Sequence, residues 1–198
     1  MMIKHYKGGK YPMSILQISA IMIMILFYGA YFSKLIAQKR KGIQTTQLGI
    51  GKKEKKTLWV EKLLKFISLV IVPIELASIL LDTNSFIPDG FRIIGIVLAS
   101  VGTFVFIIAM LTMRDSWRAG IPSEDNTKMV TSGVYSISRN PAFLGFDLTY
   151  LGFYLTFDNL PLLLFTGFAV ILMHMQILEE EKYLAYRFGT QYLEYKKM

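Results

Sequence analysis

The sequence contains no cysteine and only two histidines, His5 and His174. Without cysteine there can be no disulfide, no thiolate nucleophile and no cysteine-based metal site. Two histidines so far apart in the chain do not suggest a histidine site either, so we expect no metal. Charged residues make up only 18% of the chain, whereas a soluble domain has about 25%. Hydrophobic residues make up 53%, with a mean hydropathy of +0.43, which is typical of a membrane protein.

Apolar runs alternate with polar segments along the chain. The runs cover residues 14–37, 58–81, 91–113, 142–157 and 160–178. A helix needs about 20 residues to cross the roughly 30 Å hydrocarbon core of a bilayer. The first run is too long for a signal peptide and lacks a small-residue cleavage site. The sequence therefore predicts one all-α domain over residues 1–198, a polytopic membrane protein with about five transmembrane helices.

Basic residues predict the orientation of these helices. The loop at residues 38–56 carries seven lysines and arginines, whereas the turns after the second and fourth runs carry Asp82, Asp89 and Asp158. Short basic loops stay in the cytosol. We therefore expect this loop, residues 114–140 and the tail at residues 179–198, an amphipathic helix, on the cytosolic side of a cell's inner membrane. Topology and anionic lipid headgroups account for the net charge of +8, so we expect no nucleic-acid partner.

Several polar residues lie within or beside the apolar runs. A charge within the membrane marks a functional site or a buried pair. Glu75 is expected to pair with a Lys or Arg from another helix, or to be protonated, if its role is structural. For Asp147 the structural and functional interpretations stay equal, and His174 is either a packing residue or a site residue. Trp117 and Arg118 suit interfacial anchoring as well as a site.

Three glutamates, at positions 179 to 181, follow the last apolar run. Anions are unfavourable where a helix ends, an objection that disappears if the helix continues through them into the tail. They then form either a solvated polar collar or a site for a cationic or hydroxyl-bearing ligand. Gln176 and Glu180, four residues apart, share one helix face.

Three motifs in the C-terminal part of the chain carry a family resemblance. Residues 127–135 read TKMVTSGVY, residues 138–145 read SRNPAFLG, and Glu180-Glu181 is followed by Phe188-Gly189, Tyr192 and Tyr195. Together with the stretch at residues 115–118, they resemble the isoprenylcysteine carboxyl methyltransferases and their prokaryotic relatives. These enzymes share their C-terminal half with phospholipid methyltransferases. The resemblance covers residues 114–198.

The resemblance implies an integral membrane enzyme that transfers a methyl group from S-adenosylmethionine (SAM) to a lipophilic acceptor among the membrane lipids. Such an enzyme works in the manner of a protein-S-isoprenylcysteine O-methyltransferase, with a helical cofactor site on the cytosolic side. By position, the cofactor contacts would be Thr127, Lys128, Met129, Val130, Tyr135, Asn140, Pro141, Ala142, Phe143 and Glu180. Glu180 and Arg139 are the candidate catalytic residues, and Gln176, Trp117, Arg118 and His174 are the candidate acceptor contacts.

Three positions depart from the pattern of that family. Asn140 replaces a histidine, Phe143 replaces a tyrosine, and Gln176 replaces a basic residue, which weakens the case for an anionic acceptor. A prenylated thiol compound, a lipid amine and another apolar metabolite all remain open as acceptors. One alternative is an NADPH-dependent membrane reductase of the sterol-reductase type, but those proteins lack the glutamate pair and carry cysteine in its place. A non-enzymatic membrane protein is the other alternative, supported by Asn140 and Gln176.

Overall fold

The computed structural model describes residues 12–122 and 127–197 of the chain. Its elements, in chain order, are α1 (Ile15–Arg40), α2 (Lys55–Leu80), α3 (Phe91–Met113), the short 3-10 helices η1 (Arg114–Ser116) and η2 (Gly133–Ser136), α4 (Pro141–Thr156), α5 (Leu160–Phe188) and α6 (Thr190–Lys197). In the described ranges there is no strand, only an isolated bridge between Thr46 and Ala119. The predicted all-α fold is therefore confirmed.

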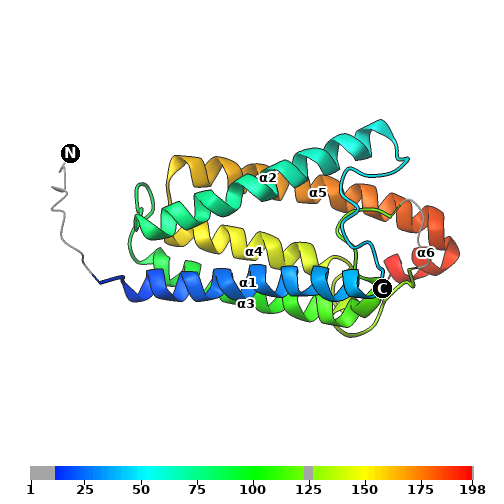
Figure 1. Cartoon of the computed structure of the whole chain (residues 1–198), viewed down its shortest axis with the longest axis horizontal. Helices are drawn as coiled ribbons and strands as arrows, with labels where there is room; N and C mark the ends of the chain where they lie inside the picture. The colour runs from blue at the N-terminus through cyan, green and yellow to red at the C-terminus, as the bar shows by residue number, and fades with distance from the viewer. Residues whose placement is uncertain (1–11, 123–126, 198) are drawn as a thin grey trace.

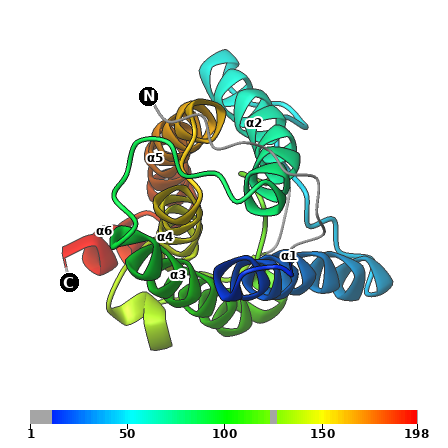
Figure 2. The same ribbon diagram turned by 90° about the vertical axis from the view of Figure 1, so that its left-hand side faces the viewer.

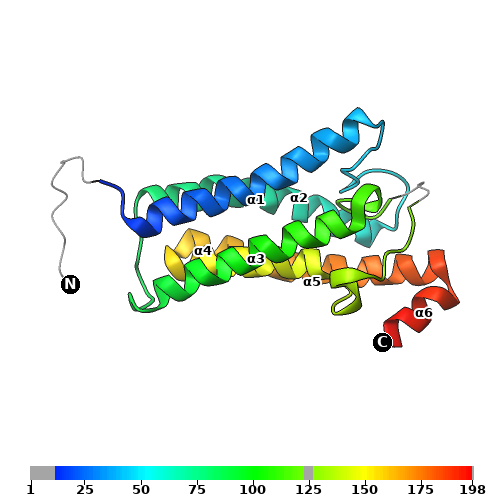
Figure 3. The same cartoon turned by 90° about the horizontal axis from the view of Figure 1, so that it is seen from below.

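Four helices are long and apolar enough to cross a bilayer: α1, α2, α5 and α3 continued through η1. The sequence predicted about five. The remaining helix, α4, has 16 residues and measures about 24 Å at the helical rise, which is less than the roughly 30 Å of a bilayer core. It still lies within the bundle beside α3, as Figures 1 and 3 show.

The connections between helices gather at two opposite ends of the bundle (Figure 1). The α1–α2 connection, residues 114–122 and 127–140, and α6 lie at one end, and the α2–α3 and α4–α5 connections lie at the other. At that second end, Asp158 accepts hydrogen bonds from the backbone amides of Ser85, Phe86 and Ile87. The two polar segments with the most functional groups therefore share one end, as predicted. The side of the membrane that this end faces stays a prediction.

The C-terminal tail differs from its prediction as one amphipathic helix. Helix α5 continues through Glu179, Glu180 and Glu181 to Phe188, so these glutamates do not lie at a helix end. Gly189, with φ of 54°, ends α5, and α6 begins at the next residue. The reversal at this glycine turns α6 back against the end of the bundle (Figure 3), which brings Tyr192 into a buried position.

Helices α3 and α4 pack closely through glycines. A Cβ atom on Gly102 would lie 2.7 Å from the carbonyl oxygen of Gly145, and one on Gly145 would lie 2.7 Å from the backbone nitrogen of Phe106. Small residues of this kind let membrane helices approach each other without a hydrophobic driving force. The pair α3–α4 is thus the tightest unit of the bundle, and it fixes the direction in which α4 leaves the site described below.

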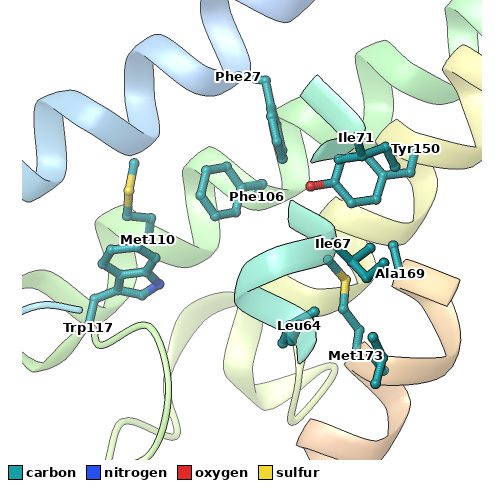
Figure 4. Close-up of a cluster of buried hydrophobic side chains, with 11 residues drawn as sticks. Phe27, Leu64, Ile67, Ile71, Phe106, Met110, Trp117, Tyr150, Ala169 and Met173 are labelled. Atoms are coloured by element: carbon teal, nitrogen blue, oxygen red, sulfur yellow. The ribbon is translucent and has the colours of Figure 1, made fainter. Parts of the chain in front are cut away.

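Helix α2 packs on α5 and α1 packs on α3, whereas α1 and α2 touch each other only sparsely (Figure 2). Between these pairs lies a buried apolar cluster drawn in Figure 4. It consists of Phe27, Leu64, Ile67, Ile71, Phe106, Met110, Trp117, Tyr150, Ala169, Leu172 and Met173. Trp117, which comes from the segment after α3, closes the cluster at the polar end of the bundle.

Candidate functional site

Two backbone segments lie side by side over the polar end of the bundle. We call residues 45–49 and 117–121 the two-segment cover. The amide of Gln47 donates to the carbonyl of Ala119 at 2.7 Å, and the amide of Ala119 donates to the carbonyl of Thr45 at 3.0 Å. The Gln38 side chain joins both segments, because it donates to the carbonyl of Trp117 and accepts from the hydroxyl of Thr45.

Glu61 attaches this cover to α2. Its side chain is completely buried and accepts hydrogen bonds from the backbone amides of Gly49 at 2.8 Å and Ile121 at 2.9 Å, one from each segment. Lys53 lies 2.5 Å from the same carboxylate, and both side chains are almost inaccessible to solvent. A buried carboxylate needs such a charge partner and hydrogen-bond donors, since burial alone would strongly disfavour its charge.

A neutral amide links Glu61 to Glu180. The Nε2 atom of Gln176 lies 3.1 Å from Oε1 of Glu180 and 3.4 Å from Oε1 of Glu61, so its two hydrogens serve two carboxylates. The Oε1 atom of Gln176 is buried and has no hydrogen-bond partner among the described residues. Lys53 neutralises Glu61, and no cation of the described residues forms an ion pair with Glu180. The carboxyl group of Glu180 therefore has no charge partner among the described residues and is available to a ligand.

A polar cavity of about 140 Å³ lies on one side of Glu180. It is lined by residues 116–118, 120–122 and 127–130, by Met113, Tyr135, Arg139, Asn140, Ala142, Phe143 and Glu180, and by Tyr183, Leu184, Phe188, Tyr192 and Tyr195. Its walls combine aromatic rings with charged groups, which suits a ligand that has both a ring system and polar atoms.

Contacts between α5, α6 and the preceding segments fix these walls. Arg139 lies 3.2 Å from Glu181, which Lys196 approaches to 2.8 Å. The hydroxyl of Tyr195 donates to the carbonyl of Tyr135 at 2.5 Å. Burial and then the negative charge of Glu180 raise the pKa of the Tyr135 hydroxyl above its ordinary value. Tyr135 is therefore a neutral hydrogen-bonding group at physiological pH.

An apolar cavity of about 300 Å³ lies on the other side of Glu180. It is lined by Tyr28, Tyr31, Phe32 and Leu35 of α1, by Thr46, Leu48 and residues 117–120 of the cover, by Leu64, Lys65, Ser68, Leu69 and Val72 of α2, by Ala142, Phe143, Phe146 and Tyr150 of α4, and by Met173, Gln176 and Glu180 of α5. Phe32 and Leu69 are 55% and 67% exposed on the outer surface. The cavity thus opens sideways between α1 and α2, where a bilayer would surround the protein.

The two cavities share one wall. Six residues line both of them, namely Trp117, Arg118, Gly120, Ala142, Phe143 and Glu180. A polar ligand and an apolar ligand that fill the two cavities would meet at this wall, beside Glu180 and the ring of Phe143. Such an arrangement suits the transfer of a small group between a polar donor and a lipophilic acceptor.

Comparison with known proteins identifies the family. A profile of the phospholipid methyltransferases matches residues 91–191, which is just over half of the 198 residues. The chain belongs to the phospholipid methyltransferase family. The matched residues contain α3 to α5, η2 and the start of α6, which build nearly all of the polar cavity. Helices α1 and α2 of this family member lie outside the match.

Three curated proteins are similar to this phospholipid methyltransferase family member. It is 35% identical over 107 residues to protein-S-isoprenylcysteine O-methyltransferase of Saccharomyces cerevisiae, 34% over 110 residues to that of Xenopus laevis, and 38% over 78 residues to protein-S-isoprenylcysteine O-methyltransferase B of Arabidopsis thaliana. These matches cover 52%, 53% and 38% of this chain and 45%, 38% and 39% of the relatives. The chain therefore spans less than half the length of these relatives.

Most of the residues predicted for the site lie together in this family member. Every predicted cofactor contact except Pro141 lines the polar cavity, as do Arg139, Trp117 and Arg118. Pro141 is buried at the first position of α4, where its fixed φ starts the helix after Asn140. Gln176 lines the apolar cavity beside Glu180. The roles of these residues toward a ligand stay predictions.

Other predicted residues are not brought to the two cavities. His174 is exposed on α5 and lines neither cavity. It lies two positions before Gln176, and residues two positions apart on an α-helix point to different faces. Asp147 also lines neither cavity. Glu75 is completely buried, and it accepts a hydrogen bond from the hydroxyl of Tyr28 at 2.8 Å. Of the two structural expectations for Glu75, the pairing with a Lys or Arg is not found among the described residues, and the protonated carboxyl stays a prediction.

Some important residues were not predicted from the sequence. Glu61 was not among the predicted site residues, but it is a buried anchor of the cover. Its position on α2, on the same face as Leu64 and Thr57, was a signal in the sequence, because these residues are spaced by three and four. The aromatic residues Tyr183, Tyr192 and Tyr195 belong to the third motif, yet only the structure shows that they line the polar cavity.

Proposed function

We propose that this protein is a membrane methyltransferase that transfers a methyl group from SAM to a lipophilic acceptor. Family membership and the names of the three relatives support the reaction class. The observation that carries the proposal is the shared wall, which joins a polar and an apolar cavity at one free carboxylate. The polar cavity would hold the methyl donor, and the apolar cavity would hold the acceptor.

The residues of the polar cavity fit SAM. Glu180, which lines this cavity, offers a carboxylate for the amino group or the ribose hydroxyls. The rings of Tyr135 and Phe143 would line the adenine or sulfonium region, where a cation is favoured over an aromatic face. When bound, SAM supplies an electrophilic methyl group, and the protein supplies position and electrostatics.

The chain's own groups would contribute mainly by holding two reactants in line. Arg139 is fixed by Glu181 and would orient the donor from the polar side. Trp117 and the rest of the two-segment cover would keep water from the shared wall, so that the reaction occurs in a closed site. Trp117 and Arg118, which line both cavities, would contact the acceptor together with Gln176.

The proposal also covers location and domain organisation. We propose that the protein lies in a cell's inner membrane and that the end carrying the cover and α6 faces the cytosol, because the basic loop lies there. Residues 114–198 would form the cofactor-binding half of a single domain over residues 1–198. The lateral opening between α1 and α2 would admit a lipophilic acceptor from the bilayer.

A ligand titration tests the proposal. Purified protein in detergent is titrated with SAM, with its demethylated product and with NADPH, and thermal stability and calorimetric heat are recorded. Ligands that bind only the native state raise its stability, so SAM and its product should stabilise the protein and NADPH should not. Stabilisation by NADPH alone would favour the reductase. No response to any of the three would favour a non-enzymatic protein.

A variant tests the role of Glu180 within this proposal. We expect Glu180→Gln to weaken SAM binding at least about tenfold, because it removes a charge-assisted hydrogen bond in a buried site. The amide can keep the contact with Gln176, so the protein should still fold. Glu194→Gln is the matched control, since Glu194 is exposed on α6 and lines neither cavity. Unchanged SAM affinity in Glu180→Gln would remove Glu180 from the cofactor site.

A further inference from the structure

The apolar cavity has a polar group of side chains at the end away from Glu180. Tyr28 of α1, Ser68 of α2 and Tyr150 of α4 all line this cavity. The hydroxyl of Tyr28 donates to Oε2 of Glu75 at 2.8 Å, and the hydroxyl of Tyr150 interacts with those of Tyr28 and Ser68. Three helices thus bring hydroxyl groups and a carboxyl group to one point.

This group lies deep along the bundle, far from the shared wall. Tyr150 follows Ala142 by eight residues on α4, which corresponds to about 12 Å at the helical rise. On α1, Tyr28 lies two turns away from Leu35, which lines the cavity nearer the cover. Figure 4 shows the Tyr150 hydroxyl pointing into the bundle interior, toward the side of Phe106. The rest of the cavity between the two ends is mostly apolar.

The hydrogen bonds of this group are incomplete. Glu75 is completely buried, and its Oε1 atom has no partner among the described residues. An ionisable residue at this depth is costly in a membrane, and it is retained for a helix contact or for a ligand. For a contact between helices, the one hydrogen bond between Tyr28 and Oε2 of Glu75 would be enough. Glu75 itself does not line the cavity, so the cavity-lining hydroxyls of Ser68 and Tyr150, which can each donate and accept, are the groups that can bind another polar group.

We propose that this end of the apolar cavity is a distal polar subsite, which binds a hydroxyl or carbonyl group carried on the acceptor far from its methylated atom. This inference rests on the proposed function, since it treats the apolar cavity as the acceptor site. The acceptor is then an amphiphile with two polar ends about 12 Å apart, and a plain hydrocarbon chain is a poorer ligand. Tyr150 and Ser68 are the direct contacts, and Glu75 holds Tyr28 in place.

The proposal is tested with two probes that differ by one oxygen. The protein in lipid nanodiscs is titrated with decylamine and with its ω-hydroxy analogue, whose terminal hydroxyl can reach the subsite when the ammonium group is near the shared wall. We expect the wild type to bind the hydroxylated probe about five- to tenfold more tightly, because the hydroxyl gains hydrogen bonds in an apolar surrounding. Equal or weaker binding of the hydroxylated probe, or no binding of either, would overturn the subsite.

Matched tyrosine variants locate the effect. Tyr150→Phe should abolish the preference for the hydroxylated probe and leave decylamine binding unchanged. Tyr31→Phe is the control, since Tyr31 lines the same cavity without belonging to the polar group, and the preference should remain. If Tyr150→Phe keeps the preference, the subsite lies elsewhere and the proposal fails.

The same preparations separate this proposal from the proposed function. SAM is titrated into each variant in parallel. Retained probe preference without SAM binding would reject the methyltransferase proposal and keep the subsite. Retained SAM binding without probe preference would reject the subsite and keep the methyltransferase.

Discussion

The ion pair between Lys53 and Glu61 should be the strongest single link between the cover and the helical bundle. Both side chains are almost inaccessible, and their charged atoms lie 2.5 Å apart. Glu61→Gln leaves Lys53 buried without its charge partner, and removal of one member of such a pair costs about 3 kcal/mol. Lys53→Met should cost a similar amount, since it leaves the charge of Glu61 unpaired.

The double variant distinguishes this pair from two independent contacts. Removal of both charges leaves no unpaired ion, so Glu61→Gln with Lys53→Met should cost about 2 kcal/mol or less, whereas independent effects would sum to about 6 kcal/mol. The Gln at position 61 can still accept from the amide of Gly49 or Ile121. The reasoning would be refuted if the losses of unfolding free energy in the two single variants add up in the double variant, or if either single variant loses less than about 1 kcal/mol.

Denaturant unfolding of the micelle-bound protein measures these free energies. Trp117 is a buried residue of the cover, whereas the second tryptophan, Trp59, is exposed, so the fluorescence of Trp117 in a Trp59→Phe background reports the unfolding of this region. Lys41→Met is the control, since the Lys41–Asp115 pair lies 2.9 Å apart but is more than half exposed on both sides. Exposed pairs contribute about 1 kcal/mol or less, so this variant should stay close to the wild type.

Two further predictions concern helix packing and pH. Gly145→Ala should destabilise the protein by about 1–3 kcal/mol, because its Cβ would lie 2.7 Å from the backbone of Phe106. Gly167→Ala is the control and should not destabilise the protein, since no atom lies within 4 Å of a Cβ at that position. Equal losses of stability for the two variants in denaturant unfolding would contradict the packing argument. Burial and the charge of Glu181 raise the pKa of Tyr192 from 10.0 to about 12. Between these values the unfolded chain releases the proton and the native chain keeps it, so stability should fall as pH rises from 10 to about 12 in the wild type and stay flatter in Tyr192→Phe.

Much of the fold could be predicted because the apolar runs are clear. The predicted run at residues 91–113 coincides with α3, and the charged segments between the runs fall at the two ends of the bundle. The count of full spans was less certain from sequence, because α4 is apolar throughout and only its length separates it from the others. The break at Gly189 was also missed, since a positive φ cannot be distinguished from a helical glycine in a single sequence.

The parts of the candidate site that come from continuous motifs were predictable, whereas the contacts between segments far apart in the sequence were not. Residues 127–130, Tyr135, Asn140, Ala142, Phe143 and Glu180 follow from motifs, and the structure brings them into one cavity. The contacts of Glu61 join residues up to 115 positions apart, so neither spacing nor periodicity in one segment indicates them. The bridge between Thr46 and Ala119 likewise pairs two loops with no strand pattern. His174 was predicted as a site residue because it lies near Gln176 in the sequence. Nearness in sequence does not decide which face of the helix a residue occupies.

The two cavities come from different parts of the chain, one inside the family match and one partly outside it. The polar cavity is built almost entirely from residues within the family match, whereas α1 and α2, outside that match, supply nine residues of the apolar cavity. Cofactor chemistry should therefore be common to the family, and acceptor choice should vary with α1 and α2. Tyr28, Ser68 and Glu75, which form most of the distal polar subsite, all lie on these two helices. The acceptor is thus better inferred from this part of the chain than from the names of proteins that match only the other part.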